Sequence, residues 1–288
     1  MLNPLPLFNG EVRGWPGRQN SSALHTHPTS ETPALTLSQD QLDSYRTNGF
    51  VVVEDLLPRE QVEALGERLR EYTHGERRSD EVHLHMEPRV TRGELEVTHP
   101  GDGIRKISGL VEGDDLFRAL GLHPNIVGKL QQIHGPDIKM FRNALLVKPP
   151  QVGSQKGMHQ DSPYWPIEPM DLCSCWFALD DATEENGCLG VIPQWHKKGP
   201  LPHVSVTDDF VVEDGHFDSD DMVMAPVRAG GGVFFHSLLP HYTAPNRSSA
   251  WRRAIALSYM SARARYRGDG DGPEYFPVSG VAHPGCVR

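Results

Sequence analysis

The sequence predicts a mainly β fold with helical buttresses, in which short antiparallel strands form a closed or sandwiched core. Two observations predict it. Helical patterns occupy the amino-terminal half, and many short strand-like segments separated by glycine and proline follow from Ile138 onward. The 288 residues, 38% of them hydrophobic, are enough to bury one substantial core, so a single elaborated domain is expected.

The amino-terminal part is predicted to contain an extension, two helices and a strand. Residues 1–35 are rich in Pro, Asn, Ser, Thr and Gly without a sustained period, which indicates a variable or partly disordered extension before a domain over 36–288. Ser38 is a typical N-cap and Gly49 a typical helix stop, so the segment between them is expected to be helical. FVVVEDLL follows as a strand, and Pro58 opens a second helix whose apolar residues share one face.

A lid and a third helical pattern separate these elements from the β-core. Residues 76–113 are charged and glycine-containing, which predicts a long irregular lid, and residues 114–134 are expected to be helical. The β-core is predicted over about 138–262, with a tail over 263–288. Its expected strands are IKMFRNALLV, LCSCWFALDD, CLGVIP, MVMAPV, GVFFHS and RAIALSYM.

Charge and composition disfavour several functional classes. The formal net charge is −10 and no basic stripe is present, so nucleic acid is not an expected partner. No apolar run is long enough to cross a bilayer, and the amino terminus lacks a signal-peptide pattern, so a soluble cytoplasmic protein is expected. The four cysteines do not form CxxC; Cys173 and Cys175 are interpreted as buried reduced thiols rather than metal ligands.

The stretch MHQDSPYWPIEP contains a candidate metal half-site. Residues two apart in a strand project to the same face, so His159 and Asp161 can present an imidazole and a carboxylate to one point while Gln160 points away. Alone, this pair is more readily interpreted as a hydrogen-bonded pair on the surface or in the core than as a metal site. A third ligand is needed, and His241 is favoured over His236 because a turn after it leads to an arginine-bearing strand.

The arginine expected to share the cavity is Arg252. Along the strand that it begins, Ala254, Ala256 and Ser258 lie on its side and are small enough to leave space. The neighbouring Arg253 instead shares its face with Ile255, Leu257 and Tyr259, which are typical core residues. Two histidines and one carboxylate on one face of Fe(II) leave three positions open, and these suit a bidentate 2-oxo acid and dioxygen.

Several segments together resemble the phytanoyl-CoA dioxygenase family of iron- and 2-oxoglutarate-dependent oxygenases. They are HQD, DATEENGCL, a histidine 80 residues after the aspartate, and an arginine 11 residues later within H-x-T-x-x-N-x-S-x-x-x-R. LTLSQDQLDSYRTNGFVVVEDLL and GPDIKMFRNALLVKPP are similar to other family segments. The resemblance covers roughly residues 36–262 and implies a double-stranded β-helix, the jelly-roll or cupin-like core.

The resemblance also implies roles for individual residues. It makes His159, Asp161 and His241 the Fe(II) ligands, and Arg252 the partner of the distal carboxylate of 2-oxoglutarate. Further cosubstrate contacts are implied for Thr243, Trp176 and, through a loosely aligned loop, Lys106. Ala144 stands where related members carry methionine, which implies a differently shaped cavity wall. Because position 161 is aspartate, chloride has no vacant ligand position and halogenation is disfavoured.

The expected reaction is hydroxylation of an unactivated C–H bond in a small organic metabolite, with release of succinate and CO2. Ascorbate is the expected activator in vitro, and dioxygen and the small molecule are the expected partners. Phosphate groups of a coenzyme A ester would need a basic patch, for which Arg77, Arg78, Arg89, Arg92, Lys197 and Lys198 are only scattered candidates. Substrate contacts are expected from Gln160, Tyr164, Trp165, His83 and His85, although Tyr164 and Trp165 are equally typical of a core.

Two alternatives belong to other functional classes. A metal-binding cupin-like sensor would need the three ligands but not the arginine, so Arg252 disfavours it. A non-redox metal hydrolase on the same barrel is the second alternative. Uncoupled succinate release from 2-oxoglutarate would distinguish an oxygenase from both.

Overall fold

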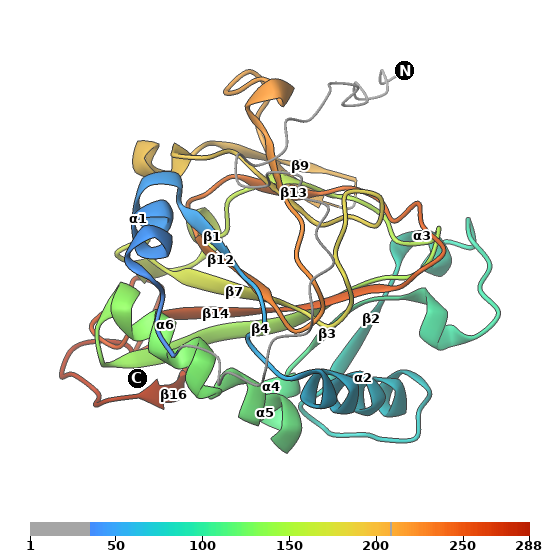
Figure 1. Ribbon diagram of the computed structural model, residues 1–288, viewed down its shortest axis with the longest axis horizontal. Coiled ribbons are helices and arrows are strands. Elements are labelled where there is room, and N and C mark those ends of the chain that lie inside the picture. Colours follow the sequence, from blue (N-terminus) through green and yellow to red (C-terminus); the bar gives the residue numbers. More distant parts are fainter. Residues whose placement is uncertain (1–34, 208) are drawn as a thin grey trace, which may run out of the picture.

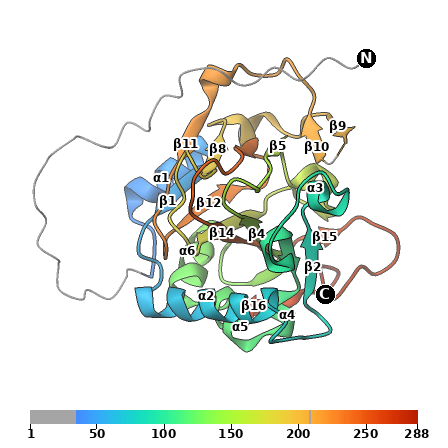
Figure 2. The same cartoon turned by 90° about the vertical axis from the view of Figure 1, so that its right-hand side faces the viewer.

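Two β-sheets face each other, and a layer of helices covers the outer face of the larger one, in the computed structural model, which describes residues 35–207 and 209–288. Figure 1 shows α2, α4, α5 and α6 along the lower side of the large sheet and the strands around β13 above it. The view turned by 90° shows the same three layers (Figure 2). This arrangement confirms the predicted mainly β, jelly-roll fold with helical buttresses.

The large sheet has the strand order β1-β12-β7-β14-β4-β3-β2, with β16 also pairing with β4. The facing sheet has the order β11-β8-β13-β5, and the pairs β10-β9 and β15-β6 lie outside both. The strands are β1 (Phe50–Val53), β2 (His83–Met86), β3 (Ile104–Ser108), β4 (Ile138–Lys148), β5 (Lys156–His159), β6 (Ile167–Glu168), β7 (Cys173–Ala178), β8 (Leu189–Val191), β9 (His203–Val206), β10 (Asp209–Val212), β11 (Val223–Ala225), β12 (Gly232–His236), β13 (His241–Thr243), β14 (Arg252–Ser261), β15 (Arg265–Tyr266) and β16 (Phe276–Ser279).

The helices begin and end at the residue types that favour helix termini. Ser38 and Gln41 form a capping box at the start of α1, and Gly49 ends that helix with a φ of 84°, where a side chain would be strained. The α-helices are α1 (Gln39–Asn48), α2 (Arg59–Thr73), α3 (Pro88–Thr91), α4 (Leu110–Gly113), α5 (Asp115–Gly121) and α6 (Pro124–His134); 3-10 turns span Pro100–Gly103, Ser162–Tyr164, Trp195–Lys198 and Ser219–Asp221.

Two apolar clusters use opposite faces of the large sheet. The first lies between the sheet and the helices and includes Leu65, Leu69, Ile255, Leu257 and Tyr259. The second lies between the two sheets and includes residues of β7, β8, β11 and β12. Because alternate residues of β14 enter different clusters, this strand separates a closed apolar layer from the space between the sheets, where the candidate site lies.

The structure corrects three sequence predictions. The expected strand over 50–57 ends at Val53, and the expected helix over 114–134 is two helices, because Pro124 cannot continue the hydrogen-bonded turn before it. The lid expected to be irregular contributes β2 and β3 to the large sheet. Residues 1–34 of the expected extension lie outside the described residues. Of the helices described, none is long and apolar enough to cross a membrane.

Candidate metal centre

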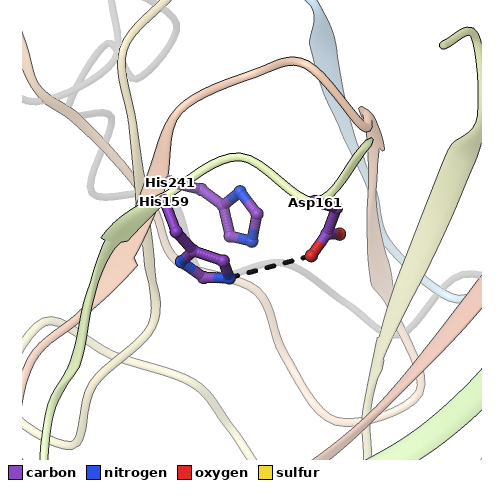
Figure 3. Close-up of side chains that lie close together, drawn as sticks. All are labelled: His159, Asp161 and His241. Carbon is purple, nitrogen blue, oxygen red and sulfur yellow. Dashed lines mark ion pairs between the residues drawn. The ribbon is translucent and has the colours of Figure 1, made fainter. Parts of the chain in front are cut away.

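Three potential ligands meet at the inner face of the smaller sheet. His159 ends β5 and pairs with His241 at the start of β13, so the two imidazoles project from directly opposite positions of neighbouring strands. Their ring centroids are 4.1 Å apart. The Asp161 carboxylate faces them, with Oδ1 3.7 Å from His159 Nε2 (Figure 3). One ligand atom from each of the three residues lies within 4.8 Å of the others.

Asp161 reaches this point by a route that strand alternation did not predict. The strand ends at His159, and Asp161 has helical backbone angles, φ −80° and ψ −52°, at the start of a 3-10 turn. Its N–H donates to the Ser237 carbonyl at 2.9 Å, which fixes the turn against the loop before β13. The expectation that the two residues share a strand face was therefore wrong, although their side chains do converge.

The two histidines present their Nε2 atoms to the centre. The Nδ1 atom of His159 lies 2.8 Å from the Gly157 carbonyl, and that of His241 lies 2.9 Å from the Leu239 carbonyl. A carbonyl only accepts, so each Nδ1 carries the proton and each Nε2 keeps its lone pair. Burial, followed by the neighbouring His241, lowers the pKa of His159 well below its usual value, and burial also lowers the pKa of His241.

This donor set fits Fe(II). It offers two neutral imidazole nitrogens and one carboxylate whose oxygens make no hydrogen bond to any described residue. Imidazole with carboxylate on one face is the set used by non-haem iron oxygenases, and the carbonyl partners supply the outer orientation that such ligands need.

His236, the rival third ligand, is directed elsewhere. It ends β12, and its Nε2 lies 3.2 Å from Asp171 Oδ1. Its Nδ1 accepts from the Leu238 N–H at 3.0 Å, so the ring is engaged at both nitrogens. The structure leaves His241 as the histidine that joins His159 and Asp161.

A cavity of about 140 Å³ opens beside the three ligands. Its wall includes Arg252, Thr243, Trp176 and Ala144, four of the positions for which the sequence resemblance implied a place in the cosubstrate pocket. Ala144 pairs with Ala256 across β4 and β14, and the two small side chains keep this part of the wall open.

Arg252 is a buried cation with an incomplete set of partners. It is 1% exposed, donates from one terminal nitrogen to the Leu146 carbonyl at 3.2 Å, and leaves Nε without a hydrogen-bond partner among the described residues. Trp176 Nε1 likewise has no hydrogen-bond partner among these residues, and the centre of its ring lies 5.2 Å from the Arg252 guanidinium carbon. Burial lowers the pKa of Arg252 to about 9, which still leaves the guanidinium charged at neutral pH. The Arg252 Nε and Trp176 Nε1 donors together would suit an anionic ligand.

Arg253 lies on the other face of the sheet. Its guanidinium donates to both oxygens of Asp180, from Nε at 2.7 Å and from a terminal nitrogen at 2.7 Å. This bidentate pair neutralises the guanidinium on the side of the sheet that faces away from the cavity, so Arg253 is not expected to bind a ligand there. The alternation that assigned Arg252 to the cavity side agrees with the observed walls.

The other candidates from the sequence lie outside the cavity wall. Gln160 is fully buried; its amide donates to the Gly199 and Leu238 carbonyls and accepts from the Leu201 N–H. These bonds give Gln160 a structural role, and the substrate contact expected of it stays a prediction. Lys106 lies on β3 opposite Leu146, next to the wall but not part of it.

The aromatic and lid candidates are near the rim or further away. His83 and His85 are exposed on the edge strand β2, and His85 Nε2 lies 3.1 Å from Ser108 Oγ. Tyr164 packs edge-on against Phe210, and Trp165 packs on Phe141. The scattered basic candidates are also absent from the wall: Arg77, Arg78, Arg89, Arg92, Lys197 and Lys198.

Sequence reasoning missed the basic side chains that do line the cavity. They are Arg105, Arg142, Lys148 and Lys156. Part of the signal was available, because Arg142, Ala144, Leu146 and Lys148 alternate along one predicted strand and share a face. The convergence of Arg105 and Lys156 depends on pairing between distant strands.

The cysteine interpretation is consistent with the structure. Cys173 and Cys175 are buried free thiols on β7, and burial raises the pKa of Cys173 to about 12. Neither thiol is part of the three-residue cluster at the candidate centre.

Comparison with known proteins gives a consistent result. The family model described as phytanoyl-CoA dioxygenase (PhyH) matches residues 45–254. The human peroxisomal phytanoyl-CoA dioxygenase is 29% identical over 300 residues, covering 94% of this chain and 88% of the relative. The α-ketoglutarate-dependent carbocyclase SnoK from nogalamycin biosynthesis is 25% identical, with a TM-score of 0.62 over 88% of this chain and 98% of that one. The apo non-haem monooxygenase ThoJ has the same fold, with a TM-score of 0.68, 21% identity and 86% coverage of each chain.

Proposed function

The chain belongs to the phytanoyl-CoA dioxygenase (PhyH) family, and from that premise we propose that it is an Fe(II)- and 2-oxoglutarate-dependent dioxygenase. Its reaction would hydroxylate a C–H bond of a small organic metabolite and release succinate and CO2. The observation that supports this most is that one cavity holds both a metal donor set and Arg252, a buried guanidinium whose Nε has no hydrogen-bond partner in the described part of the chain.

The protein residues divide into those that hold the metal and those that hold the cosubstrate. His159, Asp161 and His241 would bind Fe(II) on one face and leave the other face to the cavity. Arg252 would grip the distal carboxylate of 2-oxoglutarate, with Thr243 and Trp176 beside it on the wall. Two parallel donors of a guanidinium match the two oxygens of a carboxylate, and burial strengthens the pair by excluding water.

Iron and 2-oxoglutarate, when bound, would supply the activation and reduction of dioxygen, which no side chain of this cavity could supply alone. The protein residues would position the substrate and exclude water from the cavity. Leu146, Leu189 and Phe235 form apolar parts of the wall, so a substrate carbon held among them would be shielded from solvent. Ascorbate is proposed as an activator in vitro because it returns oxidised iron to Fe(II).

Succinate release tests the proposal. Purified chain with Fe(II), ascorbate and 2-oxoglutarate should release succinate slowly without added substrate, and anaerobic mixing should give a weak visible charge-transfer band. Iron binding without either signal would favour a metal-binding sensor or a hydrolase. No feature of the described cavity wall supports either of these alternatives.

A further inference from the structure

The cavity beside the candidate metal centre is strongly basic, although the chain as a whole carries a formal charge of −10. Its wall contains the cations Arg105, Arg142, Lys148, Lys156 and Arg252, whereas Asp161 is the only carboxylate among the described residues that line it. A local charge opposite in sign to the rest of the protein requires a reason, because like charges gathered in a partly buried space repel one another.

Two of these cations are satisfied by protein groups. Lys148 Nζ donates to the backbone carbonyls of Ser154, Thr243 and Ala244. Lys156 Nζ pairs with the Asp209 carboxylate. Both therefore shape the wall and have little left to offer a ligand.

Arg105 and Arg142 differ, because neither guanidinium has a hydrogen bond or an ion pair with any residue in the described part of the chain. The Arg142 guanidinium carbon lies 5.5 Å from the centre of the Trp165 ring, which in turn packs on Phe141. This cation–π contact holds Arg142 in place without using its N–H donors.

The pKa of Lys106, on β3, reflects the same excess of positive charge. Burial comes first in lowering the pKa of Lys106, followed by the charges of Arg142, Arg105 and Lys156. The positive charges of Arg142, Arg105 and Lys156, from β4, β3 and β5, therefore act on Lys106. An anion placed among them would relieve this repulsion.

Iron and cosubstrate would not supply that anion. Fe(II), the Asp161 carboxylate and the dianion of 2-oxoglutarate together carry one net negative charge, which Arg252 balances. Arg105 and Arg142 remain without a counter-charge after both are bound.

We propose that the substrate carries an anionic group, a carboxylate or a phosphoryl group. The half-buried Arg105 and the exposed Arg142 bind this group where the cavity of the candidate metal centre opens to solvent. The inference rests on the proposed dioxygenase function and deepens it by naming a substrate class. The anion fixes one end of the substrate on β3 and β4, and the remaining carbon skeleton extends along the cavity wall toward the metal ligands. Trp165 acts as a positioning residue that holds Arg142.

Matched ligands test the charge requirement directly. Straight-chain carboxylates of several lengths, the corresponding alkyl phosphates and the corresponding primary amides are titrated calorimetrically into the full chain, loaded anaerobically with Fe(II) and saturating 2-oxoglutarate. At one or more lengths the carboxylate or the phosphate should bind about tenfold to a hundredfold more tightly than the amide, as expected for charge-assisted hydrogen bonds. Which of the two anions binds better identifies the group.

The variants assign the effect to the two arginines. In Arg105→Gln/Arg142→Gln the preference for the anion should disappear, whereas Arg59→Gln, on the exposed surface of α2, should leave it unchanged. Equal binding of acid and amide, a preference that survives in the double variant, or no binding by any ligand would each overturn the inference. The 2-oxoglutarate titration that precedes loading reports the proposed function separately, because its failure would remove the premise and its success would leave only the anion site in question.

Discussion

His159 and His241 are oriented in the same way, since in each the Nδ1–H donates to a backbone carbonyl two residues earlier. This local geometry fixes the tautomer before a metal arrives, so ligand atoms need little rearrangement on binding. His236 has the opposite arrangement, with Nδ1 accepting from the Leu238 N–H and Nε2 facing Asp171. The two arrangements make a test possible at the level of single residues.

Alanine at any of His159, Asp161 or His241 should remove most bound iron, because two remaining ligands hold Fe(II) weakly. His236→Ala should retain close to the full iron content. Metal analysis of the purified variants after anaerobic loading measures both results. Iron content that followed His236 rather than His241 would reject the proposed third ligand.

Arg252→Ala should weaken 2-oxoglutarate binding while leaving iron binding intact. Loss of a buried charge-assisted pair costs roughly 2–5 kcal/mol, which corresponds to about one and a half to four decades in affinity. A 2-oxoglutarate titration of the iron-loaded variant, followed by the visible band, measures the change.

Arg253→Ala is the matched control for that titration. Its guanidinium pairs with Asp180 on the helix side of the sheet, so the variant should lose stability but keep its affinity for 2-oxoglutarate. The reverse outcome for the two variants would mean that the cosubstrate lies on the other side of β14.

At the scale of elements, the turn after β5 is held by a residue that never faces the cavity. Gln160 connects this turn to the segments around Gly199, Leu201 and Leu238 through three hydrogen bonds. It therefore fixes where Asp161 stands relative to the two strands that carry the histidines.

Gln160→Ala should lower the free energy of unfolding by about 1–3 kcal/mol, because buried donors and acceptors are left without partners. It should also weaken iron binding, since the Asp161 carboxylate is no longer held in register. Urea unfolding and iron titration measure the two effects, with Gln61→Ala, on the exposed surface of α2, as control. Unchanged values for both would show that the turn is fixed by other contacts.

The elements predicted correctly from the sequence are those whose signals are local. The cap at Ser38, the stop at Gly49 and the alternation from Arg252 to Ser258 each depend on neighbours in the chain. The strands β2 and β3 could not be predicted in the same way. Both are short and carry histidine or charged residues, β2 pairs with β3, and β3 pairs with β4.

The same distinction applies to the whole molecule. Of the candidate metal ligands, His241 is far in sequence from His159 and Asp161, but the three form a recognisable pattern, and the structure brings their side chains together. Arg105 and Arg142 form no such pattern, because their shared cavity exists only once β3 has paired with β4. A basic patch of this kind does not appear as a run of charges along the sequence, because its cations come from separate strands.

Acid should destabilise the metal-free molecule through its buried histidines. His134, at the end of α6, has a buried Nε2 that finds no partner within residues 35–207 and 209–288. Burial lowers its pKa to about 4 from an ordinary value of about 6.5. As the pH falls below about 6.5 the unfolded chain binds a proton that the folded chain does not, so stability is lost between that value and about 4. At pH 5 this residue alone would account for about 2 kcal/mol. The lowered pKa values of His159 and His241 act in the same direction.

Urea unfolding of the metal-free chain at several pH values from about 8 to 5 measures this loss. His134→Gln should reduce the fall in unfolding free energy by about the contribution of that one histidine, because glutamine does not titrate. The comparison uses the slope against pH, so a change in overall stability caused by the substitution does not affect it. Saturating Fe(II) should deepen the fall at low pH, since the metal stabilises only the folded state and protons compete with it for His159 and His241. A stability that rose on acidification would contradict the burial of neutral imidazoles on which the candidate centre depends.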